Sequence, residues 1–266
     1  MINSTKSYLS NFNRILKLFG IDVIKFIKTL SGIKFYLVTF FILKKQKHND
    51  TSFYFGKLYP VLDERFSDSG TMSGHYFHQD LHVAKLILEN NPKKHLDIGS
   101  RIDGFVAHVA VFREIDIIDV REQKSFVENI SFRKADLMLL PNDLINYYDS
   151  ISSLHAIEHF GLGRYGDPID YYGFEKAIDN ISKLLEISGH FYFSVPIGPQ
   201  RIEFNAHRVF SIKFLITLLE KNFKIKNFSY VNDNGNFFKN VELTQDNIDN
   251  NYGCIFGCGI FDLIKK

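Results

Sequence analysis

The fold is decided by residues 95–104, which read HLDIGSRIDG. A short apolar run ends at Gly99 and leads into a segment that can form a helix from Gly104 onward. Glycine at such a turn lets a ligand approach the backbone, and the free N–H groups at a helix start attract negatively charged groups. The pattern predicts a strand, a tight turn and a helix that together border a binding site.

Strand-like and helix-like segments alternate around this stretch. We expect further strands at 115–120, 130–133, 150–154, 190–195 (stopped by Pro196), 223–230 and 253–264, and helices at 80–90, 104–112, 174–185 and 211–222. Strands separated by helix-length segments indicate an α/β fold with a mostly parallel, doubly wound, seven-stranded sheet. The carboxyl ends of parallel strands share one edge, where ligands bind in such folds. This α/β domain is predicted over residues 80–266.

Two regions precede the domain. Residues 1–48 are predicted to be a basic helical extension made of one or two amphipathic helices, because residues 1–50 carry nine Lys or Arg against two Asp. The longest apolar stretch, 35–43, has nine residues, whereas a membrane span needs about 20. The extension then either lies on an anionic membrane surface or a partner, or packs on the main domain. Residues 49–79 are predicted to be an irregular connector or lid.

Composition sets further limits. The net charge of +2 argues against nucleic-acid binding through bulk charge, and 45% hydrophobic residues suffice for a sizeable core. Cys254 and Cys258, four apart in an expected strand, would lie too far from each other for a disulfide. Buried reduced thiols and the lack of a secretory pattern at the start favour the cytoplasm, with the inner face of the membrane as an additional location.

Two carboxylates follow the glycine turn at informative spacings. Asp119 ends the second expected strand, where it can accept hydrogen bonds from two ribose hydroxyls. Asp136 follows the third strand and can accept a hydrogen bond from an adenine amino group. The two residues together predict a nucleoside pocket.

The ordered segments resemble the class I S-adenosylmethionine-dependent methyltransferases, a superfamily with a Rossmann-like sheet. The resemblance rests on LDIGS (96–100), IDIIDVR (115–121), ADLMLLP (135–141), DSISSLHAIEH (149–159) and ISKLLEISGHFYFSVP (181–196). It implies S-adenosylmethionine as the cofactor. The implied cofactor-binding residues are Asp97, Gly99 and Gly104 for the methionine part, Asp119 for ribose, Asp136 and Leu137 for adenine, and Leu154 with His155 beside the methyl donor. Residues 206–211 resemble the loop that closes the substrate side.

One position departs from the superfamily pattern. Arg101 and Asp103 stand where the glycine loop usually has glycine. Arg101 either crowds the cofactor or binds its carboxylate group. More narrowly, residues 69–70, 74–81, 99–101 and 163–168 resemble the family called domain of unknown function 268, and this resemblance implies a glycan-related substrate.

The candidates for a general base are His155, His159, Glu158 and His207, all expected at the carboxyl edge of the sheet, and His155 is favoured because it directly follows a strand. Residues 155–159 also spell the inverted zinc-protease pattern HxxEH. That pattern requires a helix, whereas 150–154 predicts a strand running into it. The histidines of 75–82 have spacings that match no standard metal site, so no metal ligand is assigned.

The sequence therefore predicts methyl transfer from S-adenosylmethionine to a hydroxyl of a small-molecule or glycan acceptor, in surface-polysaccharide biosynthesis. Two alternatives stay open. A non-catalytic member of the fold could act as a scaffold at a membrane-associated assembly, or the cleft could bind a nucleotide-sugar for glycosyl transfer.

Overall fold

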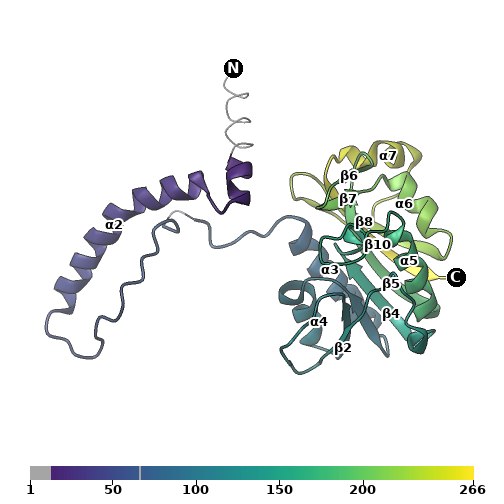
Figure 1. Ribbon diagram of the computed structural model, residues 1–266, viewed down its shortest axis with the longest axis horizontal. Helices are drawn as coiled ribbons and strands as arrows, with labels where there is room; N and C mark the ends of the chain where they lie inside the picture. Colours follow the sequence, from purple (N-terminus) through teal and green to yellow (C-terminus); the bar gives the residue numbers. More distant parts are fainter. Residues whose placement is uncertain (1–12, 66) are drawn as a thin grey trace, which may run out of the picture. The chain divides into compact units, whose positions relative to one another are not determined.

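The computed structural model describes residues 13–65 and 67–266, which divide into two compact units, Met1–Thr71 and Met72–Lys266. Predictions for residues 1–12 lie outside the described residues. The first unit is dominated by helix α2, Val23–Lys47 (Figure 1). Asp22 caps this helix, because its side chain accepts a hydrogen bond of 3.0 Å from the backbone N–H of Lys25.

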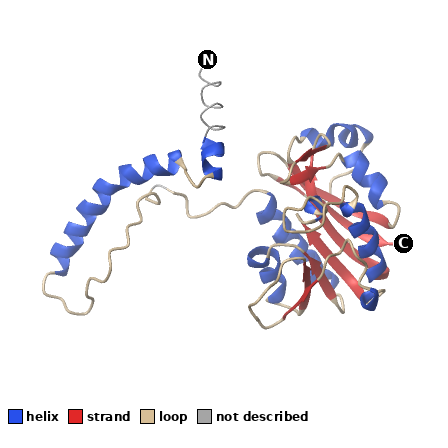
Figure 2. Ribbon diagram, viewed as in Figure 1, coloured by secondary structure: helices blue, strands red, loops and turns tan. Residues whose placement is uncertain are grey.

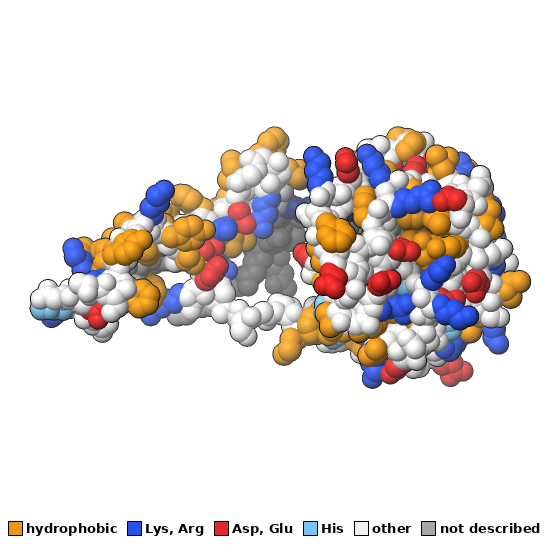
Figure 3. Space-filling view, turned by 90° about the horizontal axis from the view of Figure 1, so that it is seen from below, with side chains coloured by type: hydrophobic (Ala, Val, Ile, Leu, Met, Phe, Trp, Pro, Cys, Tyr) orange, Lys and Arg blue, Asp and Glu red, His pale blue; other side chains and the backbone are white. Residues whose placement is uncertain are grey.

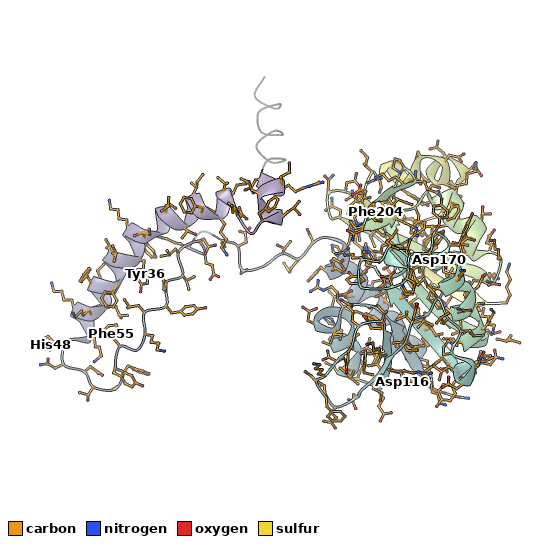
Figure 4. The ribbon with its side chains drawn as sticks, viewed as in Figure 1. Tyr36, His48, Phe55, Asp116, Asp170 and Phe204 are labelled. Atoms are coloured by element: carbon orange, nitrogen blue, oxygen red, sulfur yellow. The ribbon has the colours of Figure 1, made fainter. Side chains whose placement is uncertain are left out.

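The segment after α2 runs back along the helix. Phe55, labelled in Figure 4, lies on this returning segment. Its ring centre is 5.3 Å from that of Phe40, and the Arg65 guanidinium lies 3.6 Å from the ring centre of Phe35. A Cβ added to Gly32 would lie 1.9 Å from the carbonyl oxygen of Leu62, so glycine permits this close approach. The helix and the returning segment thus form one hairpin-like unit.

Helix α2 corrects two predictions for residues 1–48. The nine-residue apolar stretch lies inside a helix of 25 residues, which by length and composition alone could cross a membrane: an 18-residue window has a mean hydropathy of 1.6 and no buried residue. The apolar side chains are spread around the helix and do not form a single apolar face. Hydrophobic and basic side chains both lie on the surface of this unit (Figure 3).

The second unit contains one eight-stranded sheet in the order β3-β2-β1-β4-β5-β10-β8-β9. Strands β1 to β5 are parallel, whereas β10 is antiparallel to both β5 and β8. The strands are β1 (His95–Ile98), β2 (Ile115–Asp119), β3 (Ile130–Lys134), β4 (Tyr148–Leu154), β5 (Leu185–Ile197), β8 (Phe223–Val231), β9 (Phe237–Phe238) and β10 (Gly257–Lys265). A separate antiparallel pair is formed by β6 (Arg201–Glu203) and β7 (His207–Val209).

Helices cover both faces of the sheet (Figure 2). On one face, α3 (His75–Asn90), a π-helical turn η1 (Ile102–Val106) and α4 (Ala107–Ala110) enclose a core that includes Ile87, Phe105 and Ile117. On the other, α5 (Gly173–Leu184) and α6 (Ile212–Leu219) enclose a larger core that includes Ile181, Phe191 and Leu215. The remaining short elements are η2 (Asn142–Leu144), η3 (Ile157–His159), α7 (Gln245–Asn250) and η4 (Asn251–Gly253).

The predicted doubly wound α/β fold is confirmed, with β9 as an additional short edge strand. Several predicted bounds were wrong. Helix α3 begins at His75, inside the predicted connector, and the predicted helix 104–112 is the π-turn followed by α4. Strand β10 begins at Gly257, after Cys254. Pro196 lies within β5 opposite Cys258 of β10. Its carbonyl accepts a hydrogen bond from the Phe210 N–H, so its nitrogen also faces the side where the pairing with β4 has ended at Ser194, and no ladder hydrogen bond to β10 is lost.

Candidate functional site

Hydrogen bonds to Asp97 fix the conformation of the glycine turn after β1. This carboxylate is completely buried and accepts hydrogen bonds from the Ser100 hydroxyl (2.6 Å), the Ser100 backbone N–H (3.0 Å) and the Ser152 hydroxyl (2.6 Å). Burial raises the pKa of Asp97 to about 6, although these hydrogen bonds oppose the rise. Asp97 shapes the turn and lines neither cavity of the site, in contrast to its predicted contact with the cofactor.

Gly99 forms the surface of the turn. Its φ of +68° is a conformation that favours glycine, and an added Cβ would lie 3.0 Å from the Cβ of Ala156. The bare backbone therefore borders the cavity, as the prediction for Gly99 requires. Gly104 has a different role, because a Cβ there would lie 2.5 Å from an oxygen of Asp80 on α3. Gly104 permits α3 to pack against the turn and borders neither cavity.

Leu154 also differs from its predicted position beside the methyl donor. Its side chain is buried in the core beneath α3, and its backbone N–H donates a 3.0 Å hydrogen bond to the Ser100 hydroxyl. Leu154 thus connects β4 to the glycine turn.

Arg101 does not block the turn. Its guanidinium forms an ion pair of 3.2 Å with Asp103 and lies 4.9 Å from the ring centre of Tyr76. The two residues that depart from the usual glycines therefore pair with each other at the rim of the cleft. Arg101 remains within the cleft lining, where its guanidinium can reach an anionic group.

Asp119, at the end of β2, lines both cavities. Arg121 binds this carboxylate through both its side chain and its backbone. The guanidinium Nε and Nη2 donate hydrogen bonds of 3.0 and 2.7 Å to the two oxygens, and the Arg121 backbone N–H donates one of 2.7 Å to Oδ1. The guanidinium also lies 4.4 Å from the ring centre of Tyr165. A sugar hydroxyl must therefore share this carboxylate with Arg121 or displace the arginine.

Asp136 and Leu137 lie across the same cavity from Gly99. The Oδ1 atom of Asp136 accepts a 2.9 Å hydrogen bond from the Met138 backbone N–H, and its Oδ2 atom has no hydrogen bond to another described residue. The Leu137 carbonyl accepts a hydrogen bond from Asn180 on α5, which fixes this loop against the domain. Both residues line this cavity, and their assignment to a nucleoside stays a prediction.

A glycine-rich loop after η3 closes this pocket. The carboxylate of Asp167 accepts backbone hydrogen bonds from Gly161 (2.9 Å), Gly163 (3.2 Å) and Tyr165 (3.1 Å). Gly161 has a φ of +74°, and a Cβ there would lie 1.9 Å from the Asp170 carbonyl oxygen. The segment 163–168, singled out in the sequence, therefore holds Tyr165 at the wall of the pocket.

His155 follows β4 in an unusual backbone conformation, with a φ of +51°. Its Nδ1 donates a 2.8 Å hydrogen bond to Glu158, and its buried Nε2 has no hydrogen-bond partner among the described residues. Burial lowers the pKa of His155, but the Cys258 and Glu158 side chains raise it more, so the pKa lies above the usual value. The Glu158 carboxyl is also buried, and its pKa is lowered because neighbouring His155 outweighs the effect of burial.

His159 has contrasting surroundings. Its Nδ1–H donates a 2.7 Å hydrogen bond to the Ala206 carbonyl, which leaves Nε2 as the unprotonated nitrogen. Burial lowers the pKa of His159 despite the nearby Glu158 carboxylate. His159 lines both cavities, whereas His207, also with a pKa lowered by burial, lines only the outer one and lies 3.4 Å from Glu203.

The four predicted bases therefore do gather at the carboxyl edge of the sheet. The protease-like pattern does not become a helix: η3 begins only at Ile157, and the ring of His159 is directed to Ala206. Arg121 and Cys258 were missed as site residues. The position of Arg121 two residues after Asp119 was the available signal for the first, whereas nothing local in the sequence marks Cys258.

Two cavities adjoin at this edge. The residues that line the inner one include Gly99, Asp119, Asp136 and Tyr165. The outer one is a polar cleft that also contains aromatic side chains, among them Tyr76 and Phe256. Gly99, Asp119, Arg121, His155, His159 and Tyr165 line both. A molecule in the inner pocket would therefore meet a molecule in the cleft beside His159.

Two solved structures illustrate the similarity in fold. The 1,6-didemethyltoxoflavin-N1-methyltransferase of Burkholderia thailandensis, solved with 1,6-didemethyltoxoflavin and S-adenosylhomocysteine, is 17% identical with a TM-score of 0.50, over 70% of this chain and 78% of that one. The N-methyltransferase NodS of Bradyrhizobium japonicum WM9, solved with S-adenosylhomocysteine, is 16% identical with a TM-score of 0.48, over 85% and 98%. The likeness to the Burkholderia structure shows that the second unit has the fold of the class I methyltransferases.

A search of curated protein sequences finds no match to this chain. The sequence profile of DUF268, described as a Caenorhabditis protein of unknown function, matches residues 108–254. This range covers more than half of the chain and includes Asp119, Asp136, His155, His159 and the loop closed by Asp167. The chain belongs to the DUF268 family.

Proposed function

We propose that the protein transfers a methyl group from S-adenosylmethionine to a hydroxyl of a glycan or a glycan precursor. The observation that carries this proposal is the junction of two cavities: a pocket with two carboxylates suited to a nucleoside opens beside His159 into a polar cleft. Such a junction brings a bound donor and an acceptor into contact, as a transfer reaction requires.

The inner pocket fits the cofactor. Gly99 presents bare backbone where a side chain would crowd a ligand, and Asp119 and Asp136 provide acceptors for ribose hydroxyls and for an adenine amino group. The similarly folded Burkholderia methyltransferase was solved with S-adenosylhomocysteine. When bound, S-adenosylmethionine supplies an electrophilic methyl group and becomes a neutral thioether as the acceptor oxygen gains the methyl.

Arg121 has a role in this binding step. Because its guanidinium binds both oxygens of Asp119, Arg121 orients the carboxylate, and it also packs against the ring of Tyr165 at the pocket wall. The guanidinium can share the carboxylate with a sugar hydroxyl, since each oxygen has more than one acceptor site.

His159 is the base that the geometry favours. The acceptor hydroxyl loses a proton on methylation, and the unprotonated Nε2 of His159 lines both cavities and can take it. His155 is less suited, because its raised pKa keeps it protonated and its Nδ1 is engaged by Glu158. Glu158 lies beneath both histidines, with its Oε1 3.8 Å from Nε2 of His159, and stabilises the proton once transferred.

The outer cleft is suited to a hydroxylated acceptor. Its walls carry charged groups such as Arg101 and Arg164, and aromatic rings such as Tyr76 and Phe256. Guanidinium groups donate hydrogen bonds to hydroxyl oxygens, and aromatic rings pack against the apolar face of a sugar ring. These features support a glycan acceptor.

Calorimetric binding of S-adenosylmethionine and S-adenosylhomocysteine to the full-length protein tests the cofactor. We expect micromolar binding that is lost in Asp119→Ala. The matched control is Asp143→Ala. The Asp143 carboxylate also accepts hydrogen bonds from two guanidinium nitrogens, those of Arg133 at 2.6 and 3.1 Å, but it lies outside both cavities. This control should bind with unchanged affinity.

The contrary outcomes are informative. Absence of binding to folded protein would contradict the proposal and favour a non-catalytic scaffold. A nucleotide-sugar that binds where S-adenosylmethionine does not would favour glycosyl transfer. Equal loss of binding in Asp119→Ala and Asp143→Ala would show that the loss is not specific to the pocket.

A further inference from the structure

Three side chains from distant parts of the sequence meet at the floor of the outer cleft. His75 begins α3, His155 follows β4, and Cys258 lies near the start of β10. One ligand atom of each, a ring nitrogen or the thiol sulfur, lies within 4.8 Å of the corresponding atoms of the other two. The rings of His75 and His155 are nearly parallel, at 8°, with their centres 5.2 Å apart. Imidazole nitrogens and a thiolate are the ligands that zinc prefers.

The second observation is the unpartnered nitrogen of His155. Its Nε2 is buried and has no nitrogen or oxygen partner among the described residues, although a buried polar atom normally has one. Besides Glu158, the polar side chain that interacts with this ring is that of Cys258, another member of the cluster. The other ring nitrogen donates to Glu158 at 2.8 Å. A carboxylate on the far nitrogen of a histidine is the usual outer contact of a metal-bound imidazole, because it fixes the tautomer and directs the free nitrogen to the metal.

The other two residues are oriented in the same way. A ring nitrogen of His75 makes a hydrogen bond with the backbone of Phe256, which leaves the second nitrogen available. Cys258 is fully buried and not in a disulfide, and its thiol donates a 3.6 Å hydrogen bond to the side-chain oxygen of Gln79, a bond that metal binding would replace. His155 holds its ring in place at the cost of a left-handed backbone conformation, a strain that tends to occur at functional sites.

From this geometry we infer that His75, His155 and Cys258 form a binding site for a divalent transition metal ion of the zinc class. Ligand atoms of a tetrahedral zinc ion lie about 3.3–3.6 Å apart, so the three atoms must come closer together than they are in this structure. The His75 ring, which is only partly buried, must also turn out of its parallel arrangement with His155 to direct a nitrogen to the ion. Binding releases the thiol proton of Cys258 and the Nε2 proton of His155 to solvent. Three protein ligands leave a fourth position, and His75 and His155 both border the outer cleft.

The fourth position suits a water molecule or an oxygen of the acceptor. A metal-bound hydroxyl loses its proton more readily, and His159 lines the same cleft to receive it. This use of the metal rests on the proposed methyl transfer, whereas the metal site itself does not.

Cobalt(II) titration of the full-length protein, stripped of metal by chelator, tests the site without any cofactor. We expect one equivalent of cobalt to bind, with visible bands typical of tetrahedral cobalt and a near-ultraviolet thiolate-to-cobalt charge-transfer band, and zinc should displace it. The charge-transfer band should disappear in Cys258→Ser and persist in Cys254→Ser, since Cys254 is the other buried free cysteine.

A second pair of variants guards against misfolding of Cys258→Ser. His75→Gln should weaken cobalt binding by at least tenfold, whereas His78→Gln, one helical turn along α3 and outside the ligand set, should leave it unchanged. The proposed metal site would be contradicted if the unsubstituted protein showed no charge-transfer band, or if the band persisted in Cys258→Ser. Calorimetry with S-adenosylhomocysteine on the same samples reports on the cofactor pocket separately, so failure of the metal site and failure of the proposed methyl transfer are distinguishable.

Discussion

His155 and His159 are four residues apart, yet their surroundings give the two imidazoles opposite tendencies. His155 is enclosed by Glu158 and Cys258, which raise its pKa, whereas burial dominates at His159 and lowers its pKa. The hydrogen bond to Ala206 further fixes the proton of His159 on Nδ1. The two residues therefore suit different tasks at one edge of the sheet.

At the scale of single residues, we predict that His159→Gln lowers kcat by about 10²–10⁴-fold, the usual contribution of a general base, with little change in S-adenosylmethionine affinity. Because the pKa of His159 is lowered, its neutral form persists below the usual value of about 6.5. The kcat/KM of the normal enzyme should thus fall only as the pH drops through this lowered pKa, and stay flat above it. The charged groups that act on the ring are Glu158, which raises its pKa, and Arg164 and His155, which lower it.

The measurement is a pH profile of methyl transfer, with exposed His48→Gln as the control. An acidic limb with the same midpoint in His159→Gln would assign the base to another residue.

At the scale of elements, the loop of residues 161–167 depends on one carboxylate. Asp167 satisfies three backbone N–H groups and thereby holds Tyr165 at the inner pocket. We predict that Asp167→Ala weakens S-adenosylhomocysteine binding by about tenfold, because the loop loses hydrogen bonds worth about 1 kcal/mol each. Asp170→Ala, which removes a carboxylate paired with Lys176 outside the pocket, should bind normally. Calorimetry that finds equal affinities for all three proteins would show that the loop does not close over the cofactor.

Helix α2 makes a separate prediction at this scale. Because its apolar residues are exposed all around a helix of 25 residues and lysines occupy its last turn, we predict that it associates with anionic membranes. In sedimentation with anionic phospholipid vesicles, Val38→Asp with Phe41→Asp should reduce pelleting at least about tenfold, because carboxylates are costly in the bilayer. The control replaces a valine and a phenylalanine of the second unit that are even more exposed, Val111 and Phe126, by Asp. Equal pelleting of both variants and the normal chain would remove the membrane prediction.

At the scale of the whole molecule, the second unit contains the sheet, both hydrophobic cores and both cavities. We predict that a chain beginning at Met72 unfolds cooperatively and binds S-adenosylhomocysteine with an affinity within about twofold of the full-length protein, because no group of the pocket is removed. Thermal unfolding followed by circular dichroism, together with calorimetry, checks this. A truncated chain that aggregates or lacks a cooperative transition would show that the unit does not fold by itself.

The sequence by itself determined the local features of this protein. The alternation of strands and helices, the turn at Gly99 and the positions of the carboxylates at the end of β2 and after β3 follow from periodicity and residue type within short windows. The fold was therefore predictable, whereas the binding of a nucleoside by these carboxylates stays a prediction. The bounds of the elements were less predictable from the sequence. Pro196 was expected to end a strand, and β5 continues past it because the pairing with β4 has already ended at Ser194.

Only the tertiary structure decided which groups meet. Three predicted cofactor residues instead connect the glycine turn to other elements. Asp97 binds Ser152 of β4, Gly104 packs against Asp80 of α3, and Leu154 of β4 binds Ser100 in the turn. The opposite tendencies of His155 and His159 depend on burial and on Cys258, which is 103 positions away from His155 in the chain. Chemistry at a site depends on distances between side chains, and residues far apart in sequence come within those distances only when the sheet is assembled.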